Sequence, residues 1–300
     1  MVGETSTIKF SRSDKIFHGV SYGVLTVILL AVLYPIYFVV IASFSEPTAV
    51  ARGETLLWFS EFSFVGYETL LENQQIWRGY LNSFVYLFLG TALNLVVTIP
   101  AAYALSRKDL VGRGVIMGIF VFTMFFSGGL IPTYLLVQSL GMVNTIWPVV
   151  ILQAVNVFYL IIARTFFEST VPGELWDSAR VDGCRNSTFF FRIVLPLSKA
   201  IIAVMALYYG VFHWNQFFIP FIYLKDRDLY PLQVVLRQIL ILNQALSEMM
   251  GGSESFVEQQ RIAESIKYGA IIVASVPMLV LYPFVQKHFV KGVLIGSVKG

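Results

Sequence analysis

The segment that decides the fold lies between two long apolar stretches and reads VPGELWDSARVDGCRNSTFFFRIVLP, from Val171 to Pro196. Its residues predict a helix, a glycine break and a second helix. Pro172 is tolerated in a first helical turn, and Glu174 lies in that turn, where a negative charge favours the helix dipole. Gly183 predicts the end of the helix, because glycine enters the left-handed conformation without a steric cost.

The two predicted helices differ in their apolar faces. The first is short and otherwise polar, and its narrow apolar face is formed by Leu175, Ala179 and Val181. After the glycine, apolar side chains return toward the neighbouring stretches; they are Phe189, Phe190 and Ile193. A short amphipathic helix with an acidic surface, next to an apolar bundle, indicates a docking element for another protein.

The rest of the chain is apolar enough to need lipid as its solvent. Of its 300 residues, 57% are hydrophobic and 13% are charged, whereas soluble domains carry about 45–50% and about 25%. A transmembrane helix needs about 20 mostly apolar residues. Six stretches qualify: Val20–Phe44, Ser83–Leu105, Gly114–Ile131, Ile146–Phe167, Ala200–Leu224 and Tyr268–Val285. We therefore expect an all-α integral membrane protein, a single transmembrane domain over residues 1–300, with Thr133–Leu140 as an interfacial helix.

Basic residues predict the orientation of the six spans. The side that holds both termini carries 14 of the 21 lysines and arginines and has a net charge of +7, while the other side has −4. Loops rich in lysine and arginine stay in the cytoplasm. Both termini and the loop at about residues 168–199 are therefore expected to be cytoplasmic, and the loop at about residues 225–266 external.

The spacing within the cytoplasmic loop resembles the signature of ABC importer permeases, which is E-A-A, three residues, G, nine residues, I, one residue, L-P. Asp177 and Ser178 replace the glutamate and the first alanine, so Glu174 is an alternative source of the acidic contact. The resemblance implies a cytoplasmic coupling-helix loop that docks on an ATPase. Its residues are Glu174, Asp177, Ser178, Ala179, Asp182, Gly183, Ile193, Leu195 and Pro196.

Other stretches resemble the carbohydrate permeases of the maltose-type group: Pro100–Arg107, Leu140–Thr145, Trp214-Asn215 and Gly292–Gly300. Gly128–Tyr134 resembles the LplC/YtcP branch, which is associated with complex, often plant-derived oligosaccharides in Gram-positive bacteria. The resemblance implies an ABC type I importer permease fold at the bacterial cytoplasmic membrane. It also implies three kinds of partner: a second homologous permease subunit in a heterodimer, two ATPase subunits and an extracellular sugar-binding lipoprotein. The C-terminal tail is expected to contact the ATPase dimer. We expect the protein to contact membrane lipid, and we expect no nucleic acid partner, no metal and no organic cofactor.

Aromatic and amide side chains predict a substrate path on the fifth span, because aromatic rings stack on sugars and amides bind hydroxyl groups. These residues are Tyr208, Tyr209, Trp214 and Asn215. The external loop is expected to contain an amphipathic helix, Leu232–Leu246. In maltose-type permeases the matching loop reaches into the binding protein, so the expected contact is the tip formed by Met250, Gly251, Gly252 and Ser253.

Two other functions remain open from the residues alone. An ion-coupled secondary carrier usually places ionisable residues inside its spans, and His213 is the only one well inside these. An intramembrane serine protease would have to pair a serine such as Ser127 with His213, but no G-x-S-x-G elbow surrounds Ser127. No P-loop occurs. We therefore expect a transport subunit rather than an enzyme, with ATP hydrolysed by separate partner subunits.

Overall fold

The computed structural model describes residues 11–59, 61–249 and 266–280. Over these residues its regular secondary structure is helical, apart from one isolated bridge between Ser45 and Phe62. This agrees with the all-helical class predicted from the apolar stretches. The chain divides into two compact units, one formed by residues 1–70 and 243–272 and the other by residues 71–242 and 273–300.

In chain order, the described helices are α1 (Arg12–Ser43), α2 (Pro47–Ala51), α3 (Val65–Glu72), α4 (Gln74–Ser106), α5 (Arg113–Phe125), α6 (Leu130–Ser139), α7 (Trp147–Ile151), α8 (Val157–Thr170), α9 (Gly173–Val181), α10 (Asn186–Phe189), a π-helical turn (Phe190–Val194), α11 (Leu195–Leu197), α12 (Lys199–Asn215), α13 (Phe218–Tyr223), a 3-10 turn (Arg227–Leu229) and α14 (Leu232–Met249). A last described helix covers Ile266–Val280.

The first unit contains α1, which begins at a capping box. The Ser11 hydroxyl accepts from the backbone of the first turn, and the Asp14 carboxylate accepts from the Ser11 N–H. Near the other end of α1, the Tyr67 hydroxyl hydrogen-bonds the Ser43 hydroxyl at 2.8 Å. The Phe44 ring stacks on the Tyr67 ring at a centroid distance of 5.1 Å. Aromatic packing therefore fixes the turn that follows α1.

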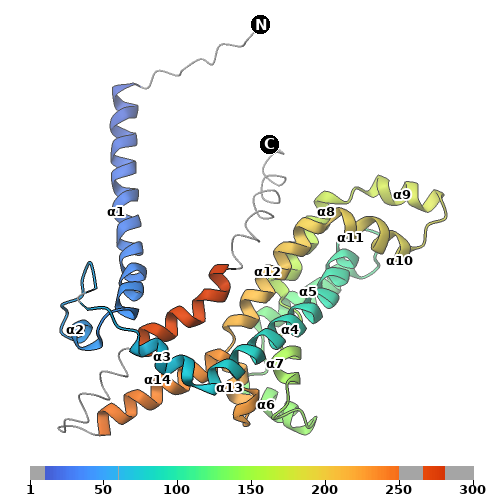
Figure 1. Cartoon of the computed structure of the whole chain (residues 1–300). Helices are drawn as coiled ribbons and strands as arrows, with labels where there is room; N and C mark the ends of the chain where they lie inside the picture. The colour runs from blue at the N-terminus through green and yellow to red at the C-terminus, as the bar shows by residue number, and fades with distance from the viewer. Residues whose placement is uncertain (1–10, 60, 250–265, 281–300) are drawn as a thin grey trace. The chain divides into compact units, whose positions relative to one another are not determined.

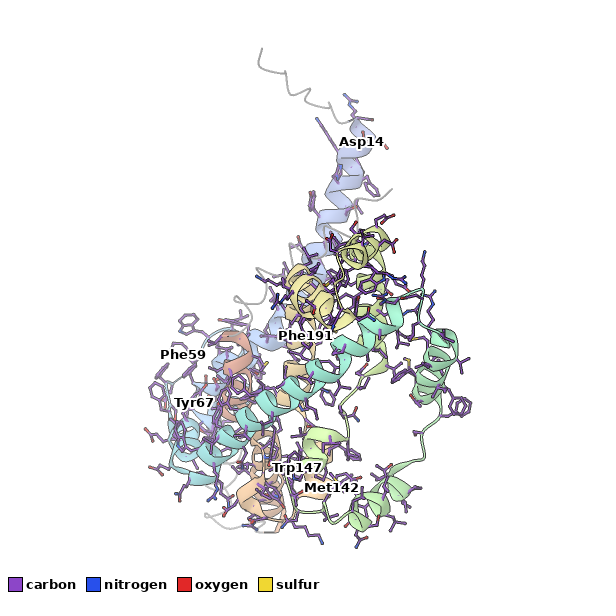
Figure 2. The ribbon with its side chains drawn as sticks, turned by 90° about the vertical axis from the view of Figure 1, so that its right-hand side faces the viewer. Asp14, Phe59, Tyr67, Met142, Trp147 and Phe191 are labelled. Carbon is purple, nitrogen blue, oxygen red and sulfur yellow. The ribbon has the colours of Figure 1, made fainter. Side chains whose placement is uncertain are left out.

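In the second unit, α4 is the central element and packs along α12, α8 and α7 (Figure 1). Five of its buried residues recur at every fourth position and so form one stripe on the helix: Tyr86, Gly90, Asn94, Thr98 and Ala102. Figure 2 labels Met142, in the turn after α6, and Trp147, the first residue of α7. The core continues toward the other end of α4, where α9 and α10 are attached.

The predicted third span is shorter than expected. Among the described helices, α1 and α4 are each long and apolar enough to cross a membrane. By contrast, α5 ends at Phe125, and α6 departs from its direction by 111°. The cause is local, since Gly129 adopts a left-handed φ of +85° between them. The short helix expected near Thr133–Leu140 is present as α6.

The predicted fourth and fifth spans are broken rather than continuous. The fourth is divided at residues 152–156, between α7 and α8, and the fifth at residues 216–217, between α12 and α13. Pro220 favours the second break, because its ring would clash with the carbonyl of Gln216 in a continuous, unkinked helix. The sixth predicted span is described as far as Val280, and its remainder to Val285 lies outside the described residues.

Candidate coupling site

The predicted helix–glycine–helix segment is present where the sequence placed it. The first helix is α9, with Pro172 as its N-cap and Glu174 in its first turn. Gly183 follows the C-cap with a φ of +73°, which confirms its predicted left-handed conformation. The N–H of Cys184 closes the turn on the carbonyl of Ala179 at 2.9 Å. The local chemistry of the segment therefore sets both ends of α9.

One face of α9 is fastened to the rest of the unit. Ala179 is buried, and Leu175 and Trp176 pack against the same core. The Trp176 ring meets the Phe189 ring edge-on at a centroid distance of 5.0 Å. Phe189 is fully buried, as the sequence predicted. Trp176 thus connects the two arms of the segment, of which the first is α9 and the second is Asn186–Leu197.

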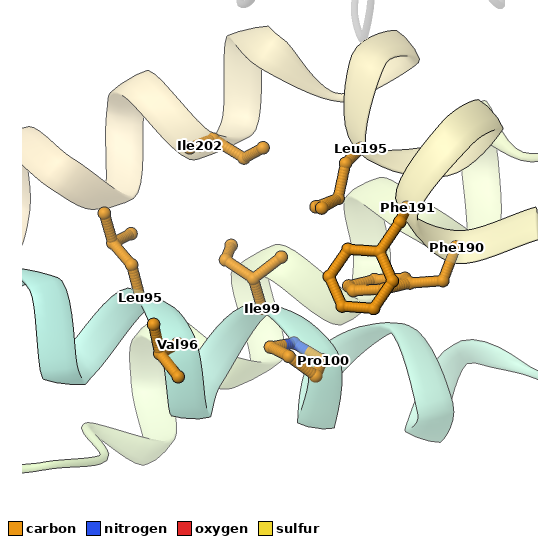
Figure 3. A pocket seen from close by; sticks show the side chains of 8 residues that line it. All are labelled: Leu95, Val96, Ile99, Pro100, Phe190, Phe191, Leu195 and Ile202. Carbon is orange, nitrogen blue, oxygen red and sulfur yellow. The ribbon is translucent and has the colours of Figure 1, made fainter. Parts of the chain in front are cut away.

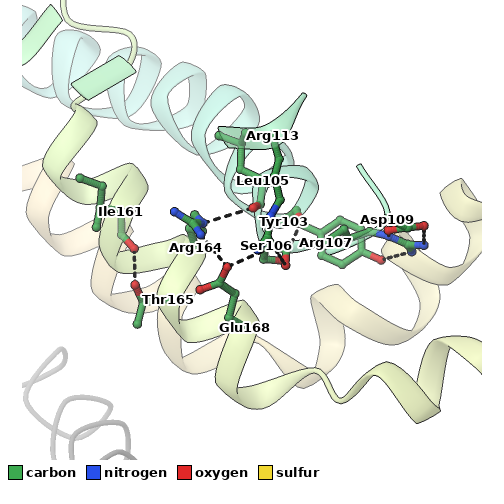
Figure 4. A network of polar contacts seen from close by, with 10 residues as sticks. All are labelled: Tyr103, Leu105, Ser106, Arg107, Asp109, Arg113, Ile161, Arg164, Thr165 and Glu168. Carbon is green, nitrogen blue, oxygen red and sulfur yellow. Dashed lines mark hydrogen bonds and ion pairs between the residues drawn. The ribbon is translucent and has the colours of Figure 1, made fainter. Parts of the chain in front are cut away.

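Arg107, just after α4, also contacts the Trp176 ring. Its guanidinium carbon lies 4.0 Å from the ring centroid, a cation–π contact. The Nε of Arg107 donates to Asp109 at 2.8 Å, and a terminal nitrogen donates to the Tyr103 hydroxyl at 3.1 Å (Figure 4). The hydrogen bond from Arg107 lowers the pKa of Asp109, and its bond to Asp109 raises the pKa of Arg107. Arg107 therefore connects the end of α4 to α9.

The last carbonyls of α4 are bound by arginines from two other helices (Figure 4). Arg164 on α8 donates to the Leu105 carbonyl at 3.2 Å, and Arg113 on α5 donates to the Ser106 carbonyl at 3.4 Å. Glu168 pairs with both arginines, at 2.7 Å and 3.6 Å. Helix-terminal carbonyls need such partners. The ends of α4, α5 and α8 are therefore tied into one support for α9.

The other face of α9 is exposed and acidic. Glu174, Asp177, Ser178 and Asp182 are all exposed. Val181 was predicted to belong to the buried apolar face, but it is 88% exposed, so that prediction is wrong. Its position, seven residues after Glu174, puts it on the same stripe as Glu174, Asp177 and Ser178. The exposed part of α9 thus carries the acidic residues Glu174 and Asp177, the apolar Val181 and the basic Arg180.

The remaining residues of the loop signature lie in the second arm. Ile193 and Leu195 are partly buried against the core, whereas Pro196 is exposed. The π-helical turn precedes Pro196, which lacks the N–H that an α-helix would direct at the Arg192 carbonyl. The second arm and α12 meet at an angle of 79°. The arm therefore joins the bundle at a sharp, proline-marked corner.

An apolar pocket of about 290 Å³ lies between this arm, α4 and α12 (Figure 3). Its lining consists of Leu95, Val96, Ile99, Pro100, Phe190, Phe191, Leu195 and Ile202. Phe190 is buried, whereas the Phe191 ring is 64% exposed at the rim. The pocket carries no polar side chain that would orient a polar ligand.

The four substrate-path candidates separate into two pairs. Tyr209 and Trp214 are buried, and both side chains have polar partners within the unit. The Tyr209 hydroxyl bonds Thr98 at 2.8 Å, and the Trp214 indole donates to the Ala274 carbonyl at 3.0 Å. Tyr208 is half-buried and Asn215 is exposed. The structure therefore leaves surface for a ligand mainly on Tyr208 and Asn215.

The elements predicted to be external are described only in part. The predicted helix Leu232–Leu246 is present as α14, and its first N–H, on Leu232, donates to the Ser83 hydroxyl of α4 at 2.9 Å. The predicted tip, Met250, Gly251, Gly252 and Ser253, lies outside the described residues, as does the C-terminal stretch Gly292–Gly300.

Sequence reasoning missed Trp176 and Asn94 as functional candidates. A large aromatic residue within a short amphipathic helix was the available signal for Trp176. Asn94, an amide in the middle of an apolar span, was the available signal for a buried polar contact. The role of Arg107 could not be read from the sequence, where it only ends the stretch Pro100–Arg107 that resembles maltose-type permeases. Its partner, Trp176, lies far away along the chain.

Comparison with known proteins identifies this arrangement. No protein-family model matches the chain. The polygalacturonan/rhamnogalacturonan transport system permease protein YtcP of Bacillus subtilis is 40% identical over 291 residues, which cover 96% of this chain and 99% of that protein. The chain belongs to the carbohydrate ABC transporter permeases. It is therefore a transport subunit of a bacterial membrane system and not an enzyme.

Two further relatives agree with this membership. Protein LplC of Bacillus subtilis is 36% identical to this permease over 299 residues and covers 100% of both chains. A crystal structure of a bacterial ABC transporter involved in the import of the acidic polysaccharide alginate matches with a TM-score of 0.81 and 30% identity. That match covers 94% of this permease and 100% of the other chain. The carrier and protease alternatives are thereby replaced by the permease assignment.

Proposed function

We propose that this permease forms half of a translocation pathway for an oligosaccharide and docks on a separate ATPase through α9. The observation that carries the proposal is the division of α9 into two faces. One face is held by Arg107, Trp176 and the core, and the other presents exposed Glu174 and Asp177. A helix fixed on one side and free on the other suits the transfer of movement between subunits.

The proposed topology has six spans within a single domain over residues 1–300, with both termini in the cytoplasm. The broken stretches α7–α8 and α12–α13 then each make one span, which is acceptable in lipid where neighbouring helices satisfy the free backbone groups. Labelling of single cysteines in intact cells tests this arrangement. Reagents that do not cross membranes should modify a cysteine placed at Arg227 and not one placed at Val181. The reverse result would exclude the proposed orientation.

The proposed partners follow from membership of the family. They are a second homologous permease, two ATPase subunits and an extracellular sugar-binding lipoprotein. The relatives named for polygalacturonan or rhamnogalacturonan transport and for alginate import support a polysaccharide fragment as the substrate. Analysis of the ligand that co-purifies with the cognate binding protein would identify the substrate. A ligand other than a carbohydrate would contradict the proposed substrate class.

Uptake by reconstituted vesicles tests the ATP-driven mechanism. We expect the vesicles to take up the sugar when ATP is supplied on the side of the ATPase subunits. Ionophores that collapse ion gradients should leave this uptake unchanged. Within the same complex, replacing both Glu174 and Asp177 by alanine should reduce uptake and co-purification of the ATPase. The matched control is Glu72→Ala together with Glu68→Ala, which removes two acidic side chains from α3. Normal uptake and co-purification in the α9 variant would exclude docking through this surface.

A further inference from the structure

The break between α7 and α8 leaves backbone groups to be satisfied within the proposed fourth span. Residues 152–156 are not helical. The side-chain amide of Asn94, on α4, donates to the carbonyl of Gln153 at 2.5 Å and to that of Ala154 at 2.9 Å. Asn94 is fully buried. Non-helical backbone is tolerated at membrane depth only where such partners exist, so one side chain of α4 supports this break.

His213 fixes the orientation of that amide. Because both N–H groups of Asn94 are used by carbonyls, its oxygen must act as an acceptor. The Nε2 of His213, on α12, lies 2.7 Å from this oxygen and is therefore assigned as the donor. Gly90, one turn before Asn94, gives the ring its space, since a Cβ there would lie 2.3 Å from His213 Nε2. The Asn94 amide is thus held in one orientation.

The start of α8 does not depend on α7. The Asn156 side chain accepts from the Tyr159 N–H at 3.3 Å and so caps α8. The Asn156 N–H donates to the Tyr209 hydroxyl of α12 at 3.1 Å. With its own cap, α8 could change its angle to α7 without breaking its internal bonds. Side chains of α4 and α12 therefore set that angle.

The angle of α8 matters because α8 leads directly to α9. Only Val171 and Pro172 separate the two helices, and Arg164 ties α8 to the end of α4. We propose that Asn94, oriented by His213, is a positioning residue that sets the angle between α7 and α8 and thereby couples movement of α9 to the membrane part of the permease. The coupling step rests on the proposed docking through α9; the control of the angle does not.

Distances between spin labels across the break test the control of the angle. In a Cys184→Ser background, one label pair at positions 147 and 165 spans the break, and a control pair at 158 and 165 lies within α8. These three positions are exposed. Asn94→Asp keeps the shape of the side chain but replaces its two N–H donors by carboxyl oxygens, which donate at most one hydrogen bond, so the cross-break distribution should broaden or shift while the control pair stays unchanged. Gly90→Ala, which displaces the His213 ring, should have the same effect.

A second readout follows the consequence for transport. In the reconstituted complex, Asn94→Asp and Gly90→Ala should raise the number of ATP molecules hydrolysed per sugar transported several-fold. His213→Leu should raise this number as well, whereas His213→Gln, which keeps a donor, should raise it much less. Unchanged cross-break distances in both the Asn94 and Gly90 variants would overturn the proposal, and so would equal broadening of the control pair. Failure of docking alone would differ, because ATPase co-purification would be lost while the label distances stayed normal.

Discussion

Removal of the contact between Arg107 and Trp176 should weaken binding of the ATPase without removing any residue of the proposed docking face. The Arg107 side chain is only 15% exposed, and its guanidinium lies 4.0 Å from the Trp176 ring. Cation–π contacts contribute about 0.5–1 kcal/mol at exposed sites and about 2 kcal/mol when desolvated. A largely buried arginine places this contact at about 1–2 kcal/mol.

That energy converts into a measurable change in affinity. A loss of about 1–2 kcal/mol corresponds to a factor of about 5–30 in an equilibrium constant. We expect Arg107→Ala and Trp176→Ala each to weaken binding of the purified ATPase to the reconstituted permease within this range. The loss in the double variant should be smaller than the sum of the two single losses, because both changes remove the shared cation–π contact.

The control is Arg107→Lys, which retains the positive charge but loses the planar group that stacks on the ring. It should bind the ATPase more weakly than the unmodified permease. Asp109→Asn, which removes an exposed partner, should cost less, since exposed ion pairs contribute about 0–1 kcal/mol. Strictly additive losses in the double variant, or affinities unchanged in both single variants, would show that Arg107 does not hold α9 through Trp176.

Three other predictions concern the same region. The bond to Arg107 lowers the pKa of Asp109 in the folded protein. The stability that this bond contributes should therefore be present above the unfolded pKa near 3.9 and be lost as the pH falls through the folded value. The unfolding temperature, measured from pH 6 to pH 3, should fall accordingly, and the fall should be smaller in Asp109→Asn. Gly183→Val should oppose the left-handed turn by about 1 kcal/mol or more and lower both ATPase affinity and uptake, with normal values in both assays as the contradicting result. Val181→Asp should weaken ATPase binding but leave the unfolding temperature unchanged, since the side chain is 88% exposed; a lowered unfolding temperature would instead indicate a buried role.

Local signals in the sequence accounted for the segment around α9. The proline and glutamate at its start and the glycine at its end were readable because a cap depends on neighbours within a few residues. The same holds for α1 and α4, whose long apolar stretches predict helices in lipid by composition alone. Ala179 and Val181 could not be separated in this way. Both are apolar, and only the position of the core decided that Ala179 is buried and Val181 exposed.

Prolines show the limit of local signals most clearly. Pro35 and Pro100 lie inside the continuous helices α1 and α4, whereas Pro220 follows a break. The residue is the same, and the outcome depends on whether neighbouring helices can satisfy the freed backbone groups.

The sequence by itself determined that this protein is helical and apolar and that it carries a helix–glycine–helix segment around α9, because those properties depend on composition and on neighbours along the chain. Only the tertiary structure decided that Arg107 meets Trp176 and that Asn94 supports the break before α8. These pairs are distant in sequence, and a hydrogen bond or cation–π contact forms only when packing brings its two groups within about 4 Å.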